Sequence, residues 1–359
     1  MRAVDIKILC PGQNWMNIGS LLANGMGGYG SPLPDGSTIA AVTGTPPAAL
    51  AMDGPRLVAS GRYQFGITTP NWALAMACEG KGPYDEPLPL RAIAAFPHDD
   101  RLALAVRAET GITSLSEIAA ERRPLKISMP TREMGHPARW VMDEILACHG
   151  FTQEDLESWG GEVLRDRPRS QNSPDAVPAD PSFDAVFDEA IMTVRWQKLT
   201  TLYDLRFLPL EEHVLRHCTG MGMPAGVLER GRLRGLDRDV PTIDFSGWIL
   251  YCAEDLPDEL AYLAVRAIDE QKDTISARFT GPTRAMTGPV DMREICRDLP
   301  VPLHPGAEAY YRENGHLTAS TASGSAASGS AAFGSAASGS AASGSAASAP
   351  TLTASTEEN

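Results

Sequence analysis

Short apolar strands that run into polar loops and then into helices recur along this chain, and this order constrains the fold most. Val4, Ile6 and Ile8 alternate with polar residues before a Pro-Gly pair, and a helical pattern follows them. Further apolar strands are predicted at residues 39–42, 63–67, 90–96, 102–106 and 125–129. Strands that alternate with helices are typical of α/β folds, so we expect an α/β protein.

The composition changes at about Leu317, where a tail rich in Gly, Ser and Ala begins. A Gly-Ser-Ala-Ala-Ser repeat recurs from Gly324 to Gly344, and such a segment has almost nothing to bury. We therefore predict that residues 317–359 are disordered, and that deletion after His316 leaves the thermal stability unchanged. The remaining residues are enough for two domains of ordinary size.

The formal net charge is −14, and the longest basic run is the pair Arg122-Arg123. Nucleic-acid binding depends on clustered Lys and Arg side chains, so this composition argues against a nucleic-acid partner. It does not exclude a small anionic ligand, because one pocket can be locally positive in an acidic protein. No segment reaches the roughly 18 consecutive apolar residues that would span a bilayer, so we expect no direct membrane insertion.

The first predicted strand begins within about four residues of Met1, which leaves no room for a cleavable signal peptide. The six cysteines are scattered without a CxxC pair, a pattern typical of reduced thiols in a cytoplasmic protein. We therefore predict a cytoplasmic location. A misassigned start codon is the alternative, in which case the protein would be periplasmic.

Residues 301–315, VPLHPGAEAYYRENG, combine an irregular turn with a short helix. Two prolines and Gly306 fix the turn, Tyr310 and Tyr311 lie in the helix, and Gly315 closes it. The segment resembles the C-terminal signature of the TAXI family, the extracytoplasmic solute-binding subunits of TRAP transporters, which ends in a similar PLHPGA–YY pattern. A C-terminal helix with a rigid entry turn explains the same residues without that relation.

The resemblance to TAXI proteins extends from about Asp5 to Gly315 and implies a two-lobed fold of the periplasmic-binding-protein type II. Two mixed sheets would enclose a ligand cleft between the lobes, which closes by a hinge when a ligand binds. We expect one lobe to comprise residues 1–106 and 244–316, and the other to comprise residues 107–243. TRAP-type membrane subunits are expected partners only if the protein is exported.

The loop from Pro130 to Gly135 follows a predicted strand and precedes a helix. A helix N-terminus with free N–H groups is an anion site, and Arg132 would add a guanidinium that holds a carboxylate with two parallel hydrogen bonds. We therefore predict that Thr131, Arg132 and Gly135 contact an anionic ligand. An ordinary helix start with a solvated arginine is the alternative.

Polar side chains also gather in the loops that follow three strands of the first lobe, where an open α/β sheet binds its ligands. The TAXI family has a Gly-rich loop at the first of these places, but Trp15 and Met16 replace its small residues here. Each polar residue alone is explained by turn or capping hydrogen bonds. As a set, the predicted ligand-binding residues are Gln13, Asn14, Asn17, Thr43, Thr45, Thr69 and Asn71.

The nearest approach to a metal site is the segment Glu211, Glu212 and His213 with His217 and Cys218. The two histidines lie four residues apart, so one helix face would offer two nitrogens and the cysteine a thiolate. No HExxH motif occurs, and two histidines on a solvated helix face are common, so we predict no metal. A Walker loop, a GxSxG elbow and a GxGxxG after a strand are also missing, and we expect no cofactor.

These features lead to two functional hypotheses. The first is reversible binding of a small organic anion, an amino acid or another carboxylate, by a TAXI-type solute-binding protein. The second is a cytoplasmic enzyme on the same scaffold, for example a decarboxylase acting on a carboxylate substrate, which the missing signal peptide motivates. For the enzyme, His136, Asp184 and His304 are the candidates for acid–base catalysis.

Overall fold

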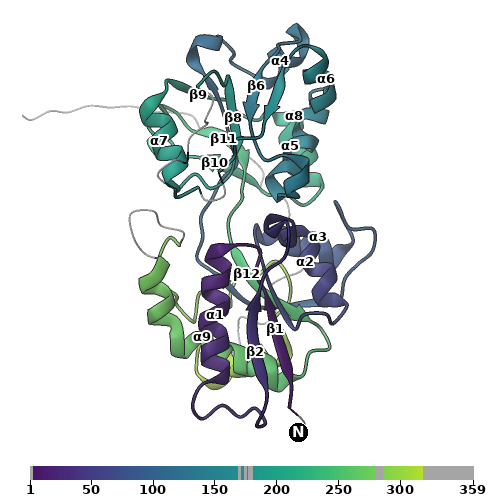
Figure 1. Cartoon of the computed structure of the whole chain (residues 1–359), viewed down its shortest axis with the longest axis vertical. Helices are drawn as coiled ribbons and strands as arrows, with labels where there is room; N and C mark the ends of the chain where they lie inside the picture. Colours follow the sequence, from purple (N-terminus) through teal and green to yellow (C-terminus); the bar gives the residue numbers. More distant parts are fainter. Residues whose placement is uncertain (1–2, 169–170, 174–175, 177–180, 280–285, 318–359) are drawn as a thin grey trace, which may run out of the picture. The chain divides into compact units, whose positions relative to one another are not determined.

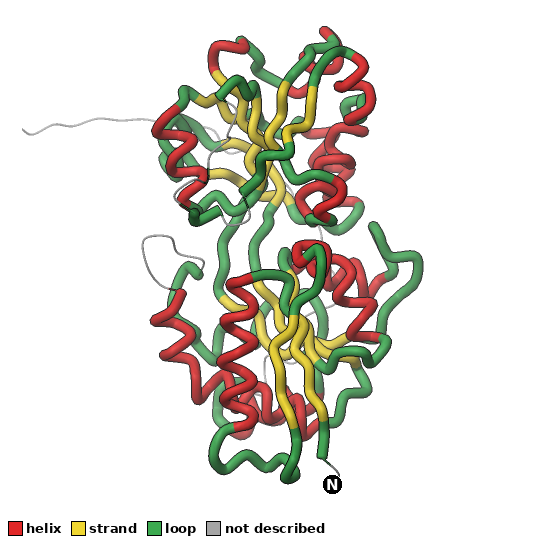
Figure 2. Tube along the Cα trace, in the orientation of Figure 1, coloured by secondary structure: helices red, strands yellow, loops and turns green. Residues whose placement is uncertain are grey.

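The computed structural model describes residues 3–168, 171–173, 176, 181–279 and 286–317. They form two α/β lobes, each built on a 5-stranded mixed sheet with helices on both faces (Figure 2). The predicted two-lobed α/β fold with two mixed sheets is therefore confirmed. No described helix has the length and hydrophobicity needed to cross a membrane. Residues 318–359, which hold most of the tail predicted to be disordered, lie outside the described part of the chain.

The first sheet has the strand order β2-β1-β3-β12-β4. Strand β1 is parallel to β2 and β3, whereas β12 is antiparallel to β3 and β4. Its strands are β1 (Asp5–Leu9), β2 (Thr38–Val42), β3 (Phe65–Thr68), β4 (Leu90–Phe96) and β12 (Trp248–Ala253).

Helices cover both faces of this first sheet because each strand that is buried on both sides needs apolar partners (Figure 1). One face packs against α1 and α9, whose side chains Ile18 and Ile268 share an apolar cluster with Ile8 of β1. The other face packs against α2 and α3, and Gly80 ends α3 in the left-handed conformation. The four helices are α1 (Gln13–Gly27), α2 (Leu50–Ala59), α3 (Asn71–Glu79) and α9 (Asp258–Phe279).

The second sheet has the order β7-β6-β8-β5-β9, with β6 parallel to β7 and β8, and β5 antiparallel to β8 and β9. Its strands are β5 (Ala103–Arg107), β6 (Lys126–Ser128), β7 (Glu162–Leu164), β8 (Ala185–Asp188) and β9 (Leu205–Phe207). A separate antiparallel ribbon pairs β10 (Ala225–Leu228) with β11 (Val240–Ile243). The helices of this lobe are α4 (Leu115–Glu121), α5 (Pro137–Cys148), α6 (Gln153–Ser158), α7 (Val194–Leu202) and α8 (Glu212–Gly220).

The chain passes between the two sheets twice, and these crossings differ from the predicted boundaries at one point. Strand β5 pairs with β8 and β9, so residues 103–107 belong to the second sheet and the first crossing is residues 97–102. That crossing lies before Val106, where we expected it, because a strand alone does not reveal which sheet it joins. The return crossing is residues 244–247, and a β-bridge joins Arg101 of the first crossing to Asp244 of the second.

The C-terminal segment, residues 302–313, packs against the edge of the first sheet, and we call it the clasp. Pro302 accepts a hydrogen bond from the Ala92 N–H, and the Ala92 carbonyl accepts one from the His304 N–H, so the segment extends the edge of β4. Helix α10 (Pro305–Glu313) then packs on α9, and the Tyr311 hydroxyl donates to the Ile93 carbonyl (3.1 Å). The turn and the tyrosines that carry the family resemblance therefore have a structural function in this chain.

Candidate functional site

The carboxyl ends of β1 and β3 open into two helices whose first turns have no side-chain cap. The two strands are parallel neighbours, β1 leads into α1 and β3 leads into α3. The residue before α1 is Gly12 and the residue before α3 is Pro70, and neither makes a side-chain capping bond. The first N–H of α3, that of Asn71, donates to the Ser246 carbonyl. The helix dipole and the remaining N–H groups of the first turns make such ends favourable for a negative charge.

Most of the polar residues predicted for the first lobe lie at this edge of the sheet. Gln13 and Asn14 begin α1, and neither side chain hydrogen-bonds to a described residue. Thr43 and Thr45 are exposed in the loop after β2, and Thr69 lies in the loop after β3. Since β2, β1 and β3 are adjacent, the topology brings the loops that follow these strands to one edge of the sheet.

Asn17 differs from the other predicted residues because its side chain already has a partner. Its Oδ1 atom accepts a hydrogen bond from Arg278 Nη2 at 2.8 Å. That bond joins α1 to α9 and leaves Asn17 with a structural contact that sequence spacing did not reveal.

Asn71 is held by the return crossing. Its N–H donates to the Ser246 carbonyl (3.0 Å), and its side chain lies over Gly247, where an added Cβ would come within 2.0 Å of the amide. Gly247 also has φ +89, so the crossing accepts only glycine at this point. The Asn71 Oδ1 atom is buried and has no hydrogen-bond partner in the part of the chain that the structure describes. A buried acceptor without a donor is costly, and a bound ligand with an N–H or O–H group would remove that cost.

Arg132 does not provide the free positive charge that we expected in the second lobe. It is half exposed, contacts the Glu154 carboxylate and lies 3.4 Å from Asp143 Oδ2. The hydrogen bonds that Arg132 donates to Glu154 and Asp143 raise its pKa, so the guanidinium is already paired with two carboxylates. These acids come from α5 and α6, and their approach depends on helix packing that the local sequence does not encode.

The loop that carries Arg132 nevertheless faces the first lobe. Gly135 has φ +58, and a Cβ at this position would lie 2.6 Å from the Ala49 Cβ. Nearby, the rings of Trp72 on α3 and Trp140 on α5 have centroids 6.4 Å apart. Thr131 begins the same loop, so the predicted ligand contacts of Thr131 and Gly135 lie on the side that meets the other lobe.

A buried ionic cluster at the carboxyl end of β8 was not predicted. Arg167 Nε donates to Asp188 Oδ2 and Arg167 Nη2 donates to Glu189 Oε1, both at 2.8 Å. Arg195 Nε lies 3.6 Å from Asp188 Oδ2, and Arg195 Nη2 donates to Ser128 Oγ (2.7 Å) at the end of β6. The available signal was the Asp-Glu pair directly after an apolar strand, which marks a strand end at the ligand-binding edge of a sheet.

Arg195 is fully buried, and its Nε and Nη1 atoms have no hydrogen-bond partner among the described residues. A buried guanidinium normally uses all of its N–H groups. Nε lies near the Asp188 carboxylate, so the Nη1 group gives Arg195 capacity for another acceptor.

His136 is the one acid–base candidate that lies in this cluster. Its Nδ1 accepts a hydrogen bond from the Ala138 N–H (3.1 Å), and its Nε2 lies 3.3 Å from Arg167 Nη2 and 3.5 Å from Glu189 Oε1. Burial, with a smaller contribution from Arg167, lowers the pKa of His136 to about 3. The imidazole is therefore neutral at physiological pH.

Asp100 of the first crossing joins the same cluster. Its carboxylate accepts hydrogen bonds from the backbone N–H groups of Ala190 (2.8 Å) and Ile191 (3.0 Å). Ala190 has φ +60, a strained conformation that these bonds support. Burial raises the pKa of Asp100 to about 6, and burial and the Asp100 charge raise that of Glu189 well above its usual value. Burial and the Asp100 charge thus favour the protonated form of Glu189.

The other two acid–base candidates lie elsewhere, and both predictions are corrected by their positions. Asp184 precedes β8, at the opposite end of the strand from Asp188, and its Oδ2 accepts from the Lys126 N–H (2.7 Å). His304 is the N-cap of α10, with Nδ1 accepting from the Gly306 N–H (3.2 Å), and is buried within the clasp described above. Both residues stabilise local structure, because each satisfies a backbone N–H at an element terminus.

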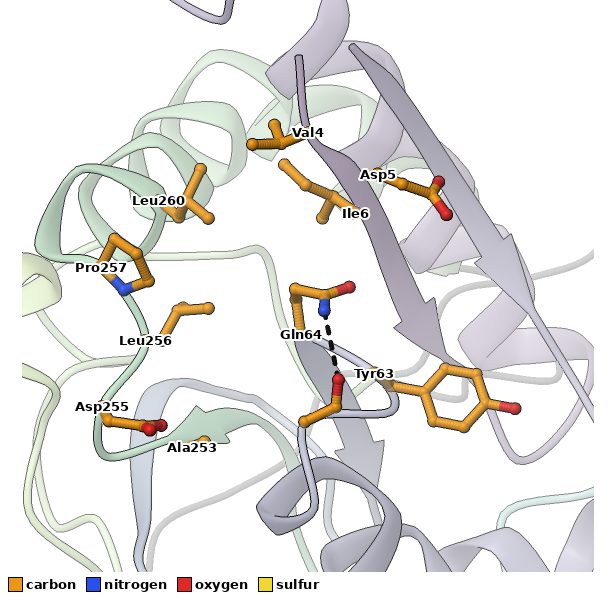
Figure 3. Close-up of a pocket in the computed structure, with 11 residues that line it drawn as sticks. Val4, Asp5, Ile6, Tyr63, Gln64, Ala253, Asp255, Leu256, Pro257 and Leu260 are labelled. Carbon is orange, nitrogen blue, oxygen red and sulfur yellow. Dashed lines mark hydrogen bonds between the residues drawn. The ribbon is translucent and has the colours of Figure 1, made fainter. Parts of the chain in front are cut away.

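The structure also contains a cavity of about 330 Å³ at the other end of the first sheet (Figure 3). Val4, which precedes β1, and Ile6 of β1 form one wall, and Leu256 and Leu260 form the opposite wall. Gln64 lies between them and donates to the Gly61 carbonyl (3.5 Å). This cavity is mostly apolar and lies at the amino end of β1, away from the loops that hold the predicted ligand-binding residues.

The fold and the site define a two-lobed α/β protein with polar strand-end loops in each lobe. Residues 49–315 match the model of the NMT1-like family, which is more than half of the sequence. The chain belongs to the NMT1-like family. No curated protein sequence matches it.

Solved structures with a similar fold include a Xanthomonas citri protein bound to ATP (11% identity, 88% of this chain and 100% of that chain, TM-score 0.45). MatC from Rhodopseudomonas palustris with bound malate has 11% identity over 87% of this chain and 97% of that one, with a TM-score of 0.40. A TctC solute-binding protein from Polaromonas has 14% identity over 74% and 83%, with a TM-score of 0.38. At these identities and scores the likenesses carry no inference about the ligand of this chain.

Proposed function

We propose that this NMT1-like protein is a solute-binding protein that binds a small organic anion, in the manner of the TAXI family. The observation that carries the proposal is the pair of uncapped helix N-termini at the adjacent carboxyl ends of β1 and β3. Two such ends side by side favour a carboxylate. The sequence resemblance of residues 301–315 to TAXI proteins supports the same class of ligand.

Asn71 and Arg195 are the side chains that we expect to contact the ligand. The buried Asn71 Oδ1 would accept a hydrogen bond from an amino or hydroxyl group of the ligand. Arg195 would donate its unpaired Nη1 group to a carboxylate. A small hydroxy or amino acid offers both kinds of group, which makes it the preferred ligand class.

The test is calorimetry of the purified full chain against hydroxy acids, amino acids and simple dicarboxylates. We expect one of these to bind, and Asn71→Ala to weaken its affinity by about 10-fold, since a lost hydrogen bond costs about 1.5 kcal/mol. Asn24→Ala is the matched control, because Asn24 is exposed near the far end of α1. Failure of the whole panel to bind folded protein, or equal affinities of Asn71→Ala and wild type, would contradict the proposal.

A second candidate is the cytoplasmic enzyme acting on a carboxylate, for example a decarboxylase. The protonated Glu189 beside the neutral His136 favours it, because a buried carboxylic acid can deliver a proton at neutral pH. Glu189→Gln would abolish turnover of a carboxylate substrate while binding remains, and product formation measured by mass spectrometry checks this. Partnership with TRAP-type membrane subunits belongs to the solute-binding proposal in an exported form of the protein.

A further inference from the structure

A second group of chemically active side chains lies in the second lobe, apart from the site described above. His149 follows the C-terminus of α5, and Glu211 and His213 lie at the N-terminus of α8. The site residue His136 is at the other end of α5, which puts the two groups about 18 Å apart along the helix axis. The two groups of residues are therefore separate candidate sites.

The ligand atoms of these three residues converge. One nitrogen of each histidine and one Glu211 oxygen all lie within 4.8 Å of one another. Glu211 Oε2 is 4.0 Å from His149 Nδ1 and 3.6 Å from His213 Nδ1. Donor atoms around a tetrahedral Zn²⁺ ion with bonds of about 2.1 Å are separated by about 3.4 Å, so small side-chain rotations complete the geometry.

The surroundings favour metal binding by these atoms. The His149 side chain is only 1% exposed and is fixed in place, whereas that of His213 is 48% exposed and can rotate toward an ion. Burial lowers the pKa of His149, which keeps its imidazole neutral and able to donate a lone pair. The Ser116 hydroxyl donates to Glu211 Oε2 (2.7 Å) and orients the carboxylate, as supporting residues do in metal sites.

His217 and Cys218, which lie near His213 in the sequence, do not belong to this group. His217 Nε2 lies 3.2 Å from Glu144 Oε2 and is paired there. Cys218 is buried in the apolar core, and burial raises the pKa of its thiol to about 12, so it does not supply a thiolate. The third ligand, His149, comes from a helix far away in sequence and was therefore not recognised.

We propose that His149, Glu211 and His213 bind one Zn²⁺ ion, with the fourth position open to water. Two imidazoles and one carboxylate are a ligand set that Zn²⁺ commonly takes in proteins. The ion joins the end of α5 to the start of α8, and it stabilises the second lobe because it binds only the folded arrangement.

The experiment uses the full chain, freed of any affinity tag and treated with a chelator. We expect calorimetry to show one equivalent of bound Zn²⁺ and a melting temperature that rises when Zn²⁺ is added. His213→Ala should weaken binding by at least about 100-fold, the upper end of the loss caused by removing only a supporting residue. Co²⁺ should give tetrahedral visible absorption in the wild type that is lost in Glu211→Gln.

His217→Ala is the matched control, because it removes a half-exposed histidine one turn further along α8. It should leave both the Zn²⁺ affinity and the Co²⁺ spectrum unchanged, and circular dichroism of the metal-free variants confirms that they are folded. Absence of stoichiometric Zn²⁺ binding, or wild-type affinity in His213→Ala, would overturn the proposal. Equal losses in His213→Ala and His217→Ala would overturn it as well.

Discussion

Asp188 and Glu189 are neighbours in sequence and carry different charges in the folded protein. Although burial raises the pKa of Asp188, Arg167 and Arg195 together hold it below its usual value. Burial and the nearby Asp100 carboxylate raise the pKa of Glu189. The two arginines therefore favour the anionic form of the first residue, whereas burial and Asp100 favour the neutral form of the second.

Because of this difference, we expect two isosteric substitutions to change the free energy of unfolding by different amounts. Asp188→Asn should lower the free energy of unfolding by about 3–5 kcal/mol, because it leaves buried arginines without their counter-charge. Glu189→Gln should not reduce stability at pH 7, because a glutamine has the donor and acceptor of the protonated acid. Urea unfolding of both variants measures the effect, and a large loss in Glu189→Gln would show that Glu189 is ionised.

Asp100 and Glu189 together predict how the free energy of unfolding changes with pH. Because the folded-state pKa values of Asp100 and Glu189 are raised, their contribution to stability is complete below about pH 4 and is lost as the pH rises through 6 and above. In Glu189→Gln one of these titrations is absent. The unfolding free energy of the variant relative to wild type should therefore increase between pH 4.5 and about pH 7.5. A difference that stays constant over this range would contradict the assignment.

At the scale of elements, the start of α10 is the tightest contact in the clasp. A Cβ on Gly306 would lie 2.1 Å from the Asp258 carbonyl oxygen, so α10 reaches α9 only with glycine here. The Tyr310 hydroxyl adds a bond of 2.9 Å to Asp269 of α9. The segment is thus adapted to hold two helices and a sheet edge together.

Gly306→Ala should therefore separate α10 from α9 and cost about 1–3 kcal/mol of stability. The control is Gly220→Ala in α8, where an added Cβ meets nothing within 4 Å and the helix gains from alanine. Thermal unfolding followed by circular dichroism should show a lower melting temperature only for Gly306→Ala. An unchanged melting temperature for Gly306→Ala would mean that the backbone of α10 can shift without a loss of stability.

At the scale of the whole molecule, Arg101 links the two crossings to each other, together with backbone hydrogen bonds between them. Arg101 Nη1 lies 2.7 Å from Asp99 Oδ1, 3.1 Å from Asp244 Oδ1 and 2.9 Å from Ser246 Oγ. Asp100, next to it, binds the strained turn after β8. Asp100 therefore bonds the first crossing to the turn that carries Glu189. We expect a movement of the crossing to shift that turn as well.

The contact between Gly135 and Ala49 gives a test of how the lobes meet. Gly135→Ala should force the two loops apart and increase hydrogen exchange at residues 46–52 and 130–136. Gly111→Ala is the control, because Gly111 has a similar φ of +73 and an added Cβ there meets nothing within 4 Å. Both variants carry comparable backbone strain, so equal exchange in the two would show that the loop contact has no influence.

The sequence alone determined the class of fold and the edge of the first sheet at which its polar loops gather. Alternating apolar residues and strand-to-helix loops are local patterns, and adjacent parallel strands necessarily bring loops such as those of Asn14, Thr69 and Asn71 to one edge.

Only the tertiary structure decided which side chains are free and which are already paired. Arg132 is matched by acids of α5 and α6, and Arg195, which sequence patterns did not single out, retains N–H groups without partners. Asp184 precedes β8 and Asp188 ends it, so the two carboxylates lie at opposite ends of the strand. Ion pairs and burial depend on segments far apart in sequence, and no local pattern records those distances.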